Sequence, residues 1–184
     1  MVKTKMFETE KYKVTVKGVR PLLHNAWNTE EKKKRKSNYD PAEDAQKALY
    51  LNKGGVPIQP AVHFEGSMIQ AAKMFKWKGR KTLMDVFKSS VFVSPEDIPF
   101  EVPEDPLNYV IDRRRAVIKQ SAITKSRPRW DDWQFTFTVS VLQPENLTGD
   151  QLQEVLEHAG AFVGIGDFRP KFGLFKIEHF EKLS

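Results

Sequence analysis

The segment GIGDFRPKFGLF near the C-terminus combines glycines with positive charge. Gly164, Gly166 and Gly173 carry no side chains, so the backbone there can adopt positive φ angles and bring its amide groups close to a phosphate. Arg169 and Lys171 add positive charge to this stretch, which we call the glycine loop and which runs from Gly164 to Gly173. These residue types predict phosphate binding. A tight corner between a helix and a strand, carrying two solvated cations, fits them equally well.

The order of elements around the glycine loop excludes two nucleotide-binding motifs. A P-loop follows a strand and ends in Lys-Ser or Lys-Thr at the start of a helix, whereas these glycines follow a predicted helix and precede a predicted strand. A dinucleotide-binding fingerprint needs a third glycine, and Arg169 stands at that position. The loop therefore belongs to neither class.

A second candidate site is a basic segment, residues 113–129, that contains no acidic residue. Its seven cations are Arg113, Arg114, Arg115, Lys119, Lys125, Arg127 and Arg129. Closely spaced like charges repel one another, so we expect them to bind an anionic partner such as the phosphates of a nucleic acid. Trp130 and Trp133 follow directly, and indole faces can stack on bases. Trp133 shares a strand face with Phe135 and Phe137 and is expected in the core instead.

Candidate catalytic residues are few. His24, in the loop after the first predicted strand, is the candidate general base for an acid–base cleavage of RNA. The four histidines lack the spacing of metal ligands, and the chain has no cysteine. The sequence thus predicts no metal and no cofactor. It favours a protein without enzymatic activity, with a metal-independent endoribonuclease using His24 as an alternative.

Length and charge limit the class of protein. The chain has 184 residues, which suits a single domain over 1–184, and a formal net charge of +6, which favours a polyanionic partner. No apolar run approaches the ~20 residues of a membrane span. The N-terminal residues lack the apolar segment of a secretory signal. We therefore expect a cytoplasmic protein with no membrane partner.

Hydrophobic periodicity predicts six main elements, because period-two alternation is typical of strands and apolar residues three and four apart are typical of helices. Strands are expected near residues 12–16, 90–93 and 133–142 and after residue 172, with helices over 61–77 and 148–162. The order strand, helix, strand, strand, helix, strand predicts an α+β fold. We expect the ferredoxin-like (RRM-like) βαββαβ arrangement, an antiparallel sheet with helices on one face.

Two insertions are expected in this core, at about 28–50 and 101–130. The first contains the charge run Lys32–Lys36, predicted to be a solvated arm, and a short helix from Pro41 to Leu49. The second contains the basic segment, predicted to be a β-hairpin. Gly66 lies inside the first core helix at some cost in helix propensity, which predicts a close packing contact there.

Three segments resemble the RAMP superfamily, the ferredoxin-like RNA-binding proteins of CRISPR effector complexes. The glycine loop resembles the family's glycine-rich loop between its last helix and last strand. Residues 56–72, VPIQPAVHFEGSMIQAA, resemble the segment in which a short strand enters the first helix, with Gly66 in the place of the family's glycine. Residues 16–26 resemble the first strand and its exit. The basic segment resembles, by its position, the protruding β-hairpin, or thumb, of the family's backbone subunits.

The resemblance implies a non-catalytic protein that binds single-stranded nucleic acid, RNA in preference to DNA, in a CRISPR- or phage-associated setting. The contacts would come from the basic segment, the cations and glycines of the glycine loop, and Lys32–Lys36 as an additional arm. Family members assemble side by side along a strand, so homo-oligomerisation on the nucleic acid is expected. The remaining alternative is a protein–protein component of a larger nucleoprotein assembly, whose hairpin grips an acidic partner.

Overall fold

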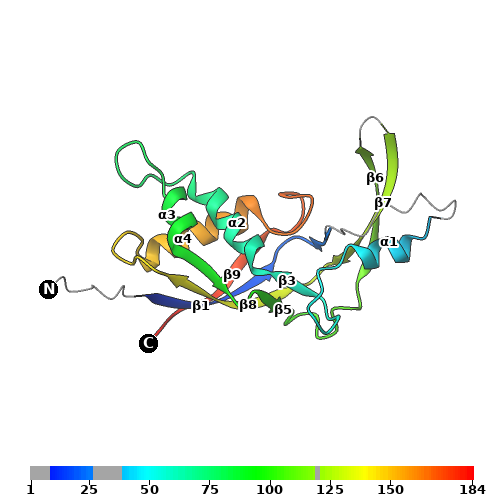
Figure 1. The fold of residues 1–184 in the computed structure, drawn as a ribbon, viewed down its shortest axis with the longest axis horizontal. Helices are drawn as coiled ribbons and strands as arrows, with labels where there is room; N and C mark the ends of the chain where they lie inside the picture. The colour runs from blue at the N-terminus through cyan, green and yellow to red at the C-terminus, as the bar shows by residue number, and fades with distance from the viewer. Residues whose placement is uncertain (1–8, 27–38, 119–120) are drawn as a thin grey trace.

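The computed structural model describes residues 9–26, 39–118 and 121–184, which form a helix-covered sheet with a long hairpin at one end (Figure 1). The main sheet has four strands in the order β4-β8-β1-β9, and every neighbouring pair is antiparallel. Its strands are β1 (Glu10–Gly18), β4 (Val91–Ser94), β8 (Gln134–Val141) and β9 (Phe175–Leu183). The alternation of apolar and polar residues in β1 and β8 buries one face of each strand, as the sequence predicts.

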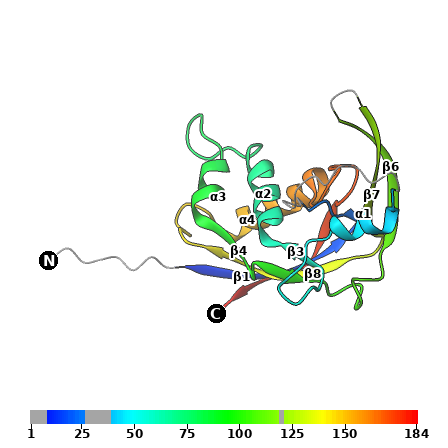
Figure 2. The same ribbon diagram turned by 45° about the vertical axis from the view of Figure 1, so that its right-hand side comes forward.

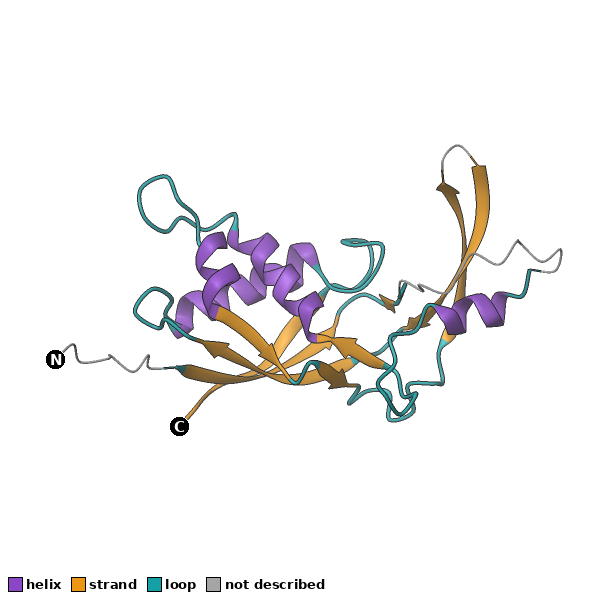
Figure 3. Cartoon of the chain, in the orientation of Figure 1, coloured by secondary structure: helices purple, strands orange, loops and turns teal. Residues whose placement is uncertain are grey.

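Three helices cover one face of the main sheet (Figure 3). They are α2 (Ala61–Ala72), α3 (Met84–Ser90) and α4 (Gly149–His158). The core lies between the layers, where Phe64 packs against Phe135, Phe137 and Phe175. Among the helices of the described residues, none has the length and apolar character needed to cross a bilayer.

The hairpin belongs to a second, three-stranded sheet. Its strands are β2 (Leu22–Leu23), β6 (Val110–Ile118) and β7 (Ser121–Trp130), in the order β2-β7-β6. The hairpin rises on the same side of the main sheet as the helices, at the end away from both termini (Figure 2). A short helix, α1 (Pro41–Lys47), packs against it, and a two-stranded pair, β3 (Ile58–Pro60) with β5 (Asp97–Pro99), lies beneath.

The structure confirms the α+β class with antiparallel sheets, but several boundaries differ. The helix predicted over 61–77 ends at Ala72. The helix predicted over 148–162 begins with a capping box between Thr148 and Gln151, then changes to a π-helical turn over Ala159–Val163. Gly160 lies in that turn, and a Cβ there would collide with the carbonyl oxygen of Phe175. The local departure from α-helix therefore accompanies a very close approach of β9.

Candidate nucleic-acid-binding site

The glycine loop joins the π-helical turn to β9, and its glycines have the positive φ angles expected from the sequence. These angles are 74° at Gly164, 73° at Gly166 and 75° at Gly173. Several of its amides, however, donate to carbonyl groups within the protein. Gly164 N donates to Ala159 O (2.8 Å), and Gly173 N donates to Pro21 O (2.8 Å). These two amide groups are therefore not available to a phosphate.

Close backbone packing accounts for the glycines themselves. A Cβ at Gly166 would stand 2.5 Å from Leu23 O, and a Cβ at Gly173 would overlap the carbonyl oxygen of Ile165. Such approaches leave no room for any side chain. Of the two interpretations left open by the sequence, the tight corner explains Gly164, Gly166 and Gly173. The glycines therefore need no ligand to explain them, and the candidates for ligand binding in the loop are its charged and aromatic side chains.

The glycine loop contacts the base of the hairpin directly. Arg127 Nε lies 2.7 Å from Asp167 Oδ2 in a largely buried ion pair. Arg114 places its guanidinium carbon 4.8 Å from the ring centroid of Phe172. These contacts join two segments that are about forty to sixty residues apart in the sequence into one surface.

The two faces of the hairpin differ. Successive strand residues point to opposite faces, and directly paired residues share a face. Arg114 pairs with Lys125, so both lie on the face that meets the glycine loop. Arg113 pairs with Ser126, whose hydroxyl contacts Tyr39 Oη (2.6 Å) beside α1. The cations of the basic segment therefore do not form a single patch, because Arg113 and Arg115 belong to the α1 side.

Carboxylates neutralise three of the basic-segment arginines, which corrects the expectation of uncompensated charge. Asp112, buried at the base of the hairpin, accepts from Arg114 Nε (2.6 Å) and lies 3.5 Å from Arg129 Nη1. Asp131 accepts from Arg129 Nε (2.8 Å), and Asp167 pairs with Arg127. Burial opposes ionisation of Asp112, but its bonds and attraction to Arg114 and Arg129 outweigh burial and lower its pKa.

The predicted cations thus divide into structural and solvent-facing groups. Arg114, Arg127 and Arg129 hold the base of the hairpin together. Arg169 and Lys171 are exposed on the glycine loop, and Lys125 is partly exposed on the hairpin face that meets the loop. Two predicted contributors, Lys119 and Lys32–Lys36, lie outside the described residues.

The tryptophans next to the basic segment are core residues. Trp130 is buried and donates from Nε1 to Pro106 O (2.9 Å), so base stacking by its indole is a wrong prediction. The reason is that the end of β7 pairs with β2, where Trp130 stands opposite Leu22 and joins the core. Trp133 is fully buried and donates to Arg20 O (2.8 Å), which confirms the core position predicted for it.

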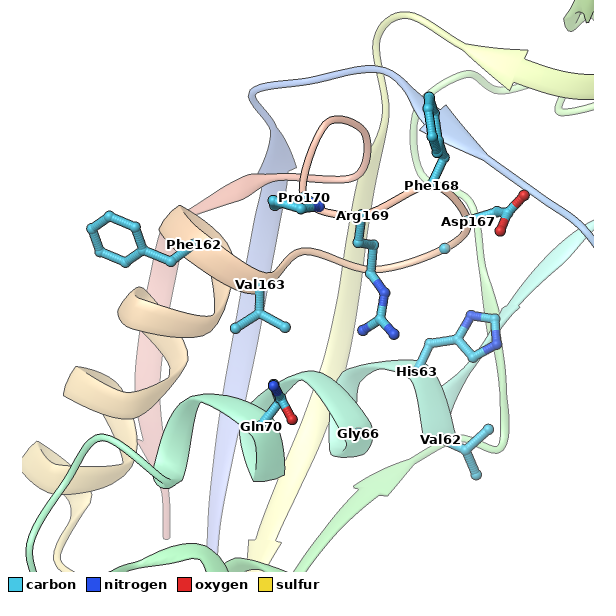
Figure 4. Close-up of a pocket in the computed structure, with 11 residues that line it drawn as sticks. Val62, His63, Gly66, Gln70, Phe162, Val163, Asp167, Phe168, Arg169 and Pro170 are labelled. Carbon is cyan, nitrogen blue, oxygen red and sulfur yellow. The ribbon is translucent and has the colours of Figure 1, made fainter. Parts of the chain in front are cut away.

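A pocket of about 660 Å³ lies between the glycine loop and α2 (Figure 4). The Arg169 side chain points from the loop toward α2, above Gly66. The remaining lining residues are Val62, His63, Gln70, Phe162, Val163, Gly166, Asp167, Phe168 and Pro170. A Cβ at Gly66 would meet nothing within 4 Å, so the close protein contact predicted there is wrong. Because Gly66 has no side chain, it leaves free space in the α2 wall of the pocket, below the Arg169 guanidinium.

His24 does not reach this pocket. Its ring is fully buried among Tyr50, Phe100 and Trp130, and its Nε2 lies 3.1 Å from Gln59 Oε1. Burial lowers the pKa of His24 to about 3, so the ring is neutral at physiological pH. A general base must reach the proton it abstracts, and a ring enclosed in the core cannot reach a ribose hydroxyl. His24 therefore cannot be the general base on which the endoribonuclease alternative depended.

His63 is a pocket residue that the sequence analysis did not single out. Its Nδ1 lies 2.6 Å from Nε2 of Gln59, whose amide oxygen faces His24. The amide therefore donates to His63 Nδ1, which leaves the proton of the neutral ring on Nε2. Burial, followed by the positive charge of Arg169, lowers the pKa of His63 to about 4. Its position four residues after Gln59, at the start of α2, was the only signal in the sequence, and a histidine at that spacing has many uses.

Metal chemistry finds no support in the part of the chain that the structure describes. Among those residues, no three His, Cys, Asp or Glu side chains gather in a way that could hold a metal ion.

Comparison with known proteins identifies the fold but no sequence family. No family model matches the chain, and a search of curated proteins finds no match. Among solved structures, the chain is similar to a chain of a complex described as the cryo-EM structure of the Type III-B Cmr-beta bound to cognate target RNA. The TM-score is 0.63 at 10% sequence identity, and the match covers 96% of this chain. This chain spans only 61% of the length of that chain, and at such low identity the likeness is one of fold.

Proposed function

We propose that this protein binds single-stranded nucleic acid, RNA in preference to DNA, without cleaving it, through a RAMP-type domain. The observation that carries the proposal is the junction of the glycine loop with the hairpin, made by Arg127 with Asp167 and by Arg114 with Phe172. Lys125 shares a hairpin face with Arg114, and Lys171 lies over the same Phe168 ring as Arg114, while Arg169 projects from the loop toward α2. Exposed cations in such an arrangement suit the repeating phosphates of a nucleic-acid strand.

The strand order supports assignment to the ferredoxin-like class as a single domain over residues 1–184. The elements β1, α2, β4, β8, α4 and β9 follow one another in the chain, and the sheet order β4-β8-β1-β9 is that of a split βαβ arrangement. The segments at about 28–50 and 101–130 are insertions in this scheme, and the second contains both strands of the basic hairpin. The similar chain from the Cmr-beta complex, bound to target RNA, is consistent with a CRISPR-associated setting.

The glycine-loop cations provide the direct test of binding. Replacing Arg169 and Lys171 together with alanine is expected to weaken binding of a labelled oligouridine about tenfold at low salt, because two charge-assisted phosphate contacts are lost. Fluorescence anisotropy at several salt concentrations measures the change, and a DNA strand of matched length tests the preference for RNA. The wild-type protein should leave the RNA intact, as judged on a denaturing gel.

A charge-matched control separates local contacts from net charge. Arg80 and Lys81 are exposed in the loop between α2 and α3, at the opposite end of the molecule from the hairpin (Figure 1). Replacing both with alanine removes the same charge and should leave affinity nearly unchanged. Equal losses from the two double variants would mean that binding follows only the overall charge and would contradict a defined surface. Absence of binding by wild type would favour a protein–protein role instead.

Gly66 tests whether the pocket itself is occupied. An alanine there gains helix propensity of roughly 0.5–1 kcal/mol, so the melting temperature should stay constant or rise slightly. Replacement with leucine would fill the open space above α2, and the same anisotropy titration should then show weaker binding. If Gly66→Leu binds like wild type, the strand does not enter the pocket, and the contacts lie along the outer side of the loop.

Assembly along the strand is the last part of the proposal. Side-by-side copies on a long RNA would give complexes whose mass increases in steps of 21.3 kDa, the mass of one chain. Mass photometry or light scattering with RNAs of increasing length would detect these steps. A single copy on every length would contradict assembly and leave binding itself intact.

A further inference from the structure

Phe168, at the tip of the glycine loop, is an exposed aromatic residue with an unusual backbone. The residue is 48% exposed. Its φ angle is 58°, and it is the one residue other than glycine with a positive φ in the part of the chain that the structure describes. Phenylalanine rarely adopts this left-handed conformation, because its Cβ crowds the backbone. Since glycine fits such positions without strain, retention of a large ring suggests that the ring is used.

The core does not need this ring. Phe172, four residues later, is the buried aromatic of the loop and fills the space against the hairpin, where Arg114 lies over it. Phe168 stacks on Phe172 with ring centroids 5.7 Å apart and an angle of 27° between the planes. Phe172 thus supports the Phe168 ring, while nearly half of the Phe168 surface reaches solvent.

Two cations lie over the exposed ring. Arg114 Cζ and Lys171 Nζ each lie 6.0 Å from the Phe168 ring centroid. Asp112 holds Arg114 in place through two hydrogen bonds, of 2.6 and 2.9 Å. An aromatic face with fixed positive charge beside it matches the two parts of a nucleotide, a base that stacks and a phosphate that pairs with a cation. Figure 4 shows the Phe168 ring and the Arg169 guanidinium pointing to opposite sides of the loop, so the ring, although Phe168 also lines the pocket at α2, points away from the guanidinium in that pocket.

We propose that Phe168 is a stacking platform for one unpaired nucleobase of the bound strand, supported by Phe172, with Arg114 and Lys171 close enough to pair with the phosphate of that nucleotide. This inference rests on the proposed function and extends it, because it adds a contact to the nucleobase, which phosphate contacts alone do not recognise. Every base offers an aromatic face, so the platform gives a preference for unpaired over duplex nucleic acid without selecting a sequence.

Phe168→Gly tests the platform, because glycine removes the ring and also suits the backbone at φ 58°. The variant should melt at or above the temperature of wild type, yet bind the labelled oligouridine on the order of tenfold more weakly. Phe168→Tyr keeps an aromatic face and should bind like wild type. A scan with a single abasic site along the RNA should reveal one position where loss of the base weakens wild type but not Phe168→Gly.

Three results would overturn the inference. If Phe168→Gly binds as tightly as wild type while Arg169→Ala with Lys171→Ala still weakens binding, the platform is wrong and the proposed function stands. If Phe168→Gly melts well below wild type, the ring is a packing residue and the platform is wrong. If wild type binds no single-stranded nucleic acid, both proposals fail together.

Discussion

Replacing Gly173 with alanine is expected to destabilise the folded protein by more than about 4 kcal/mol, or to prevent folding altogether. The new Cβ would overlap the backbone carbonyl of Ile165 at a residue whose φ is 75°, and neither backbone can move without breaking the corner. Losses of this size are diagnostic of a backbone that cannot accept a side chain. Urea denaturation followed by circular dichroism measures the loss.

Gly66→Ala is the matched control, because it makes the same chemical change at a glycine with open space around it. Gly173→Ala should be less stable than wild type by several kcal/mol, whereas Gly66→Ala should be as stable as wild type or slightly more stable. A Gly173→Ala protein as stable as wild type would contradict the tight-corner explanation, and would return the loop glycines to the set of ligand-binding candidates.

Acid is expected to destabilise the protein strongly between pH 6.5 and pH 4. Burial lowers the pKa of His24 to about 3 in the folded state, whereas an unfolded histidine titrates near 6.5. In this window the unfolded state binds a proton that the folded state excludes, so stability falls as the pH falls. His24 alone accounts for a loss on the order of 3 kcal/mol by pH 4. His63, whose pKa is lowered to about 4, acts in the same direction in this window. The lowered pKa of Asp112 adds a further loss of stability mainly below about pH 4.

The pH dependence can be assigned with His24→Gln, which keeps a polar group beside Gln59 but does not titrate. This variant should lose stability overall, since it disturbs a buried cluster, yet its free energy of unfolding should depend less steeply on pH between 6.5 and 4. Urea denaturation at a series of pH values gives both quantities. A slope identical to that of wild type would show that His24 is already accessible to protons in the folded state.

The hydrophobic periodicity of the sequence predicted the elements of the main sheet, but it did not predict the tertiary contacts that surround the candidate site. Alternation in β1 and β8 fixed which face is buried, and the apolar spacing of α4 placed it against that face. These predictions succeed because a strand or helix half exposed to solvent must display its period in its own sequence. The same reasoning placed Trp133 in the core.

The sequence analysis did not predict that carboxylates neutralise arginines of the basic segment, because these ion pairs depend on tertiary contacts. Residues 113–129 contain no acid, yet Asp112 and Asp131 stand just outside that window, and Asp167 comes from a loop almost forty residues further on. Counting charges in a window therefore overstated how much of the segment is free for a ligand. Likewise, Trp130 looked like a stacking residue only because its pairing with Leu22 in β2 cannot be read from local pattern.

The sequence located the glycine loop correctly, but the roles of its residues differ from the prediction. Its glycines allow the backbone to pack against Leu23 and Ile165, while Arg169 and Phe168 project from the corner so formed and Lys171 is exposed beside them. A rigid corner is a suitable support for such side chains, since they are held in place before any ligand arrives. The sequence could not separate these roles because both favour glycine.

The central claim is that the glycine loop and the hairpin face beside it bind one strand together. Its most direct test is the salt dependence of RNA binding for Arg169→Ala, Lys125→Ala and the double variant. Each lost phosphate contact should reduce the slope of log K against log salt concentration by about 0.7, and the double variant by about twice as much. Slopes that equal the wild-type value in Lys125→Ala and fall only in Arg169→Ala would contradict a shared surface.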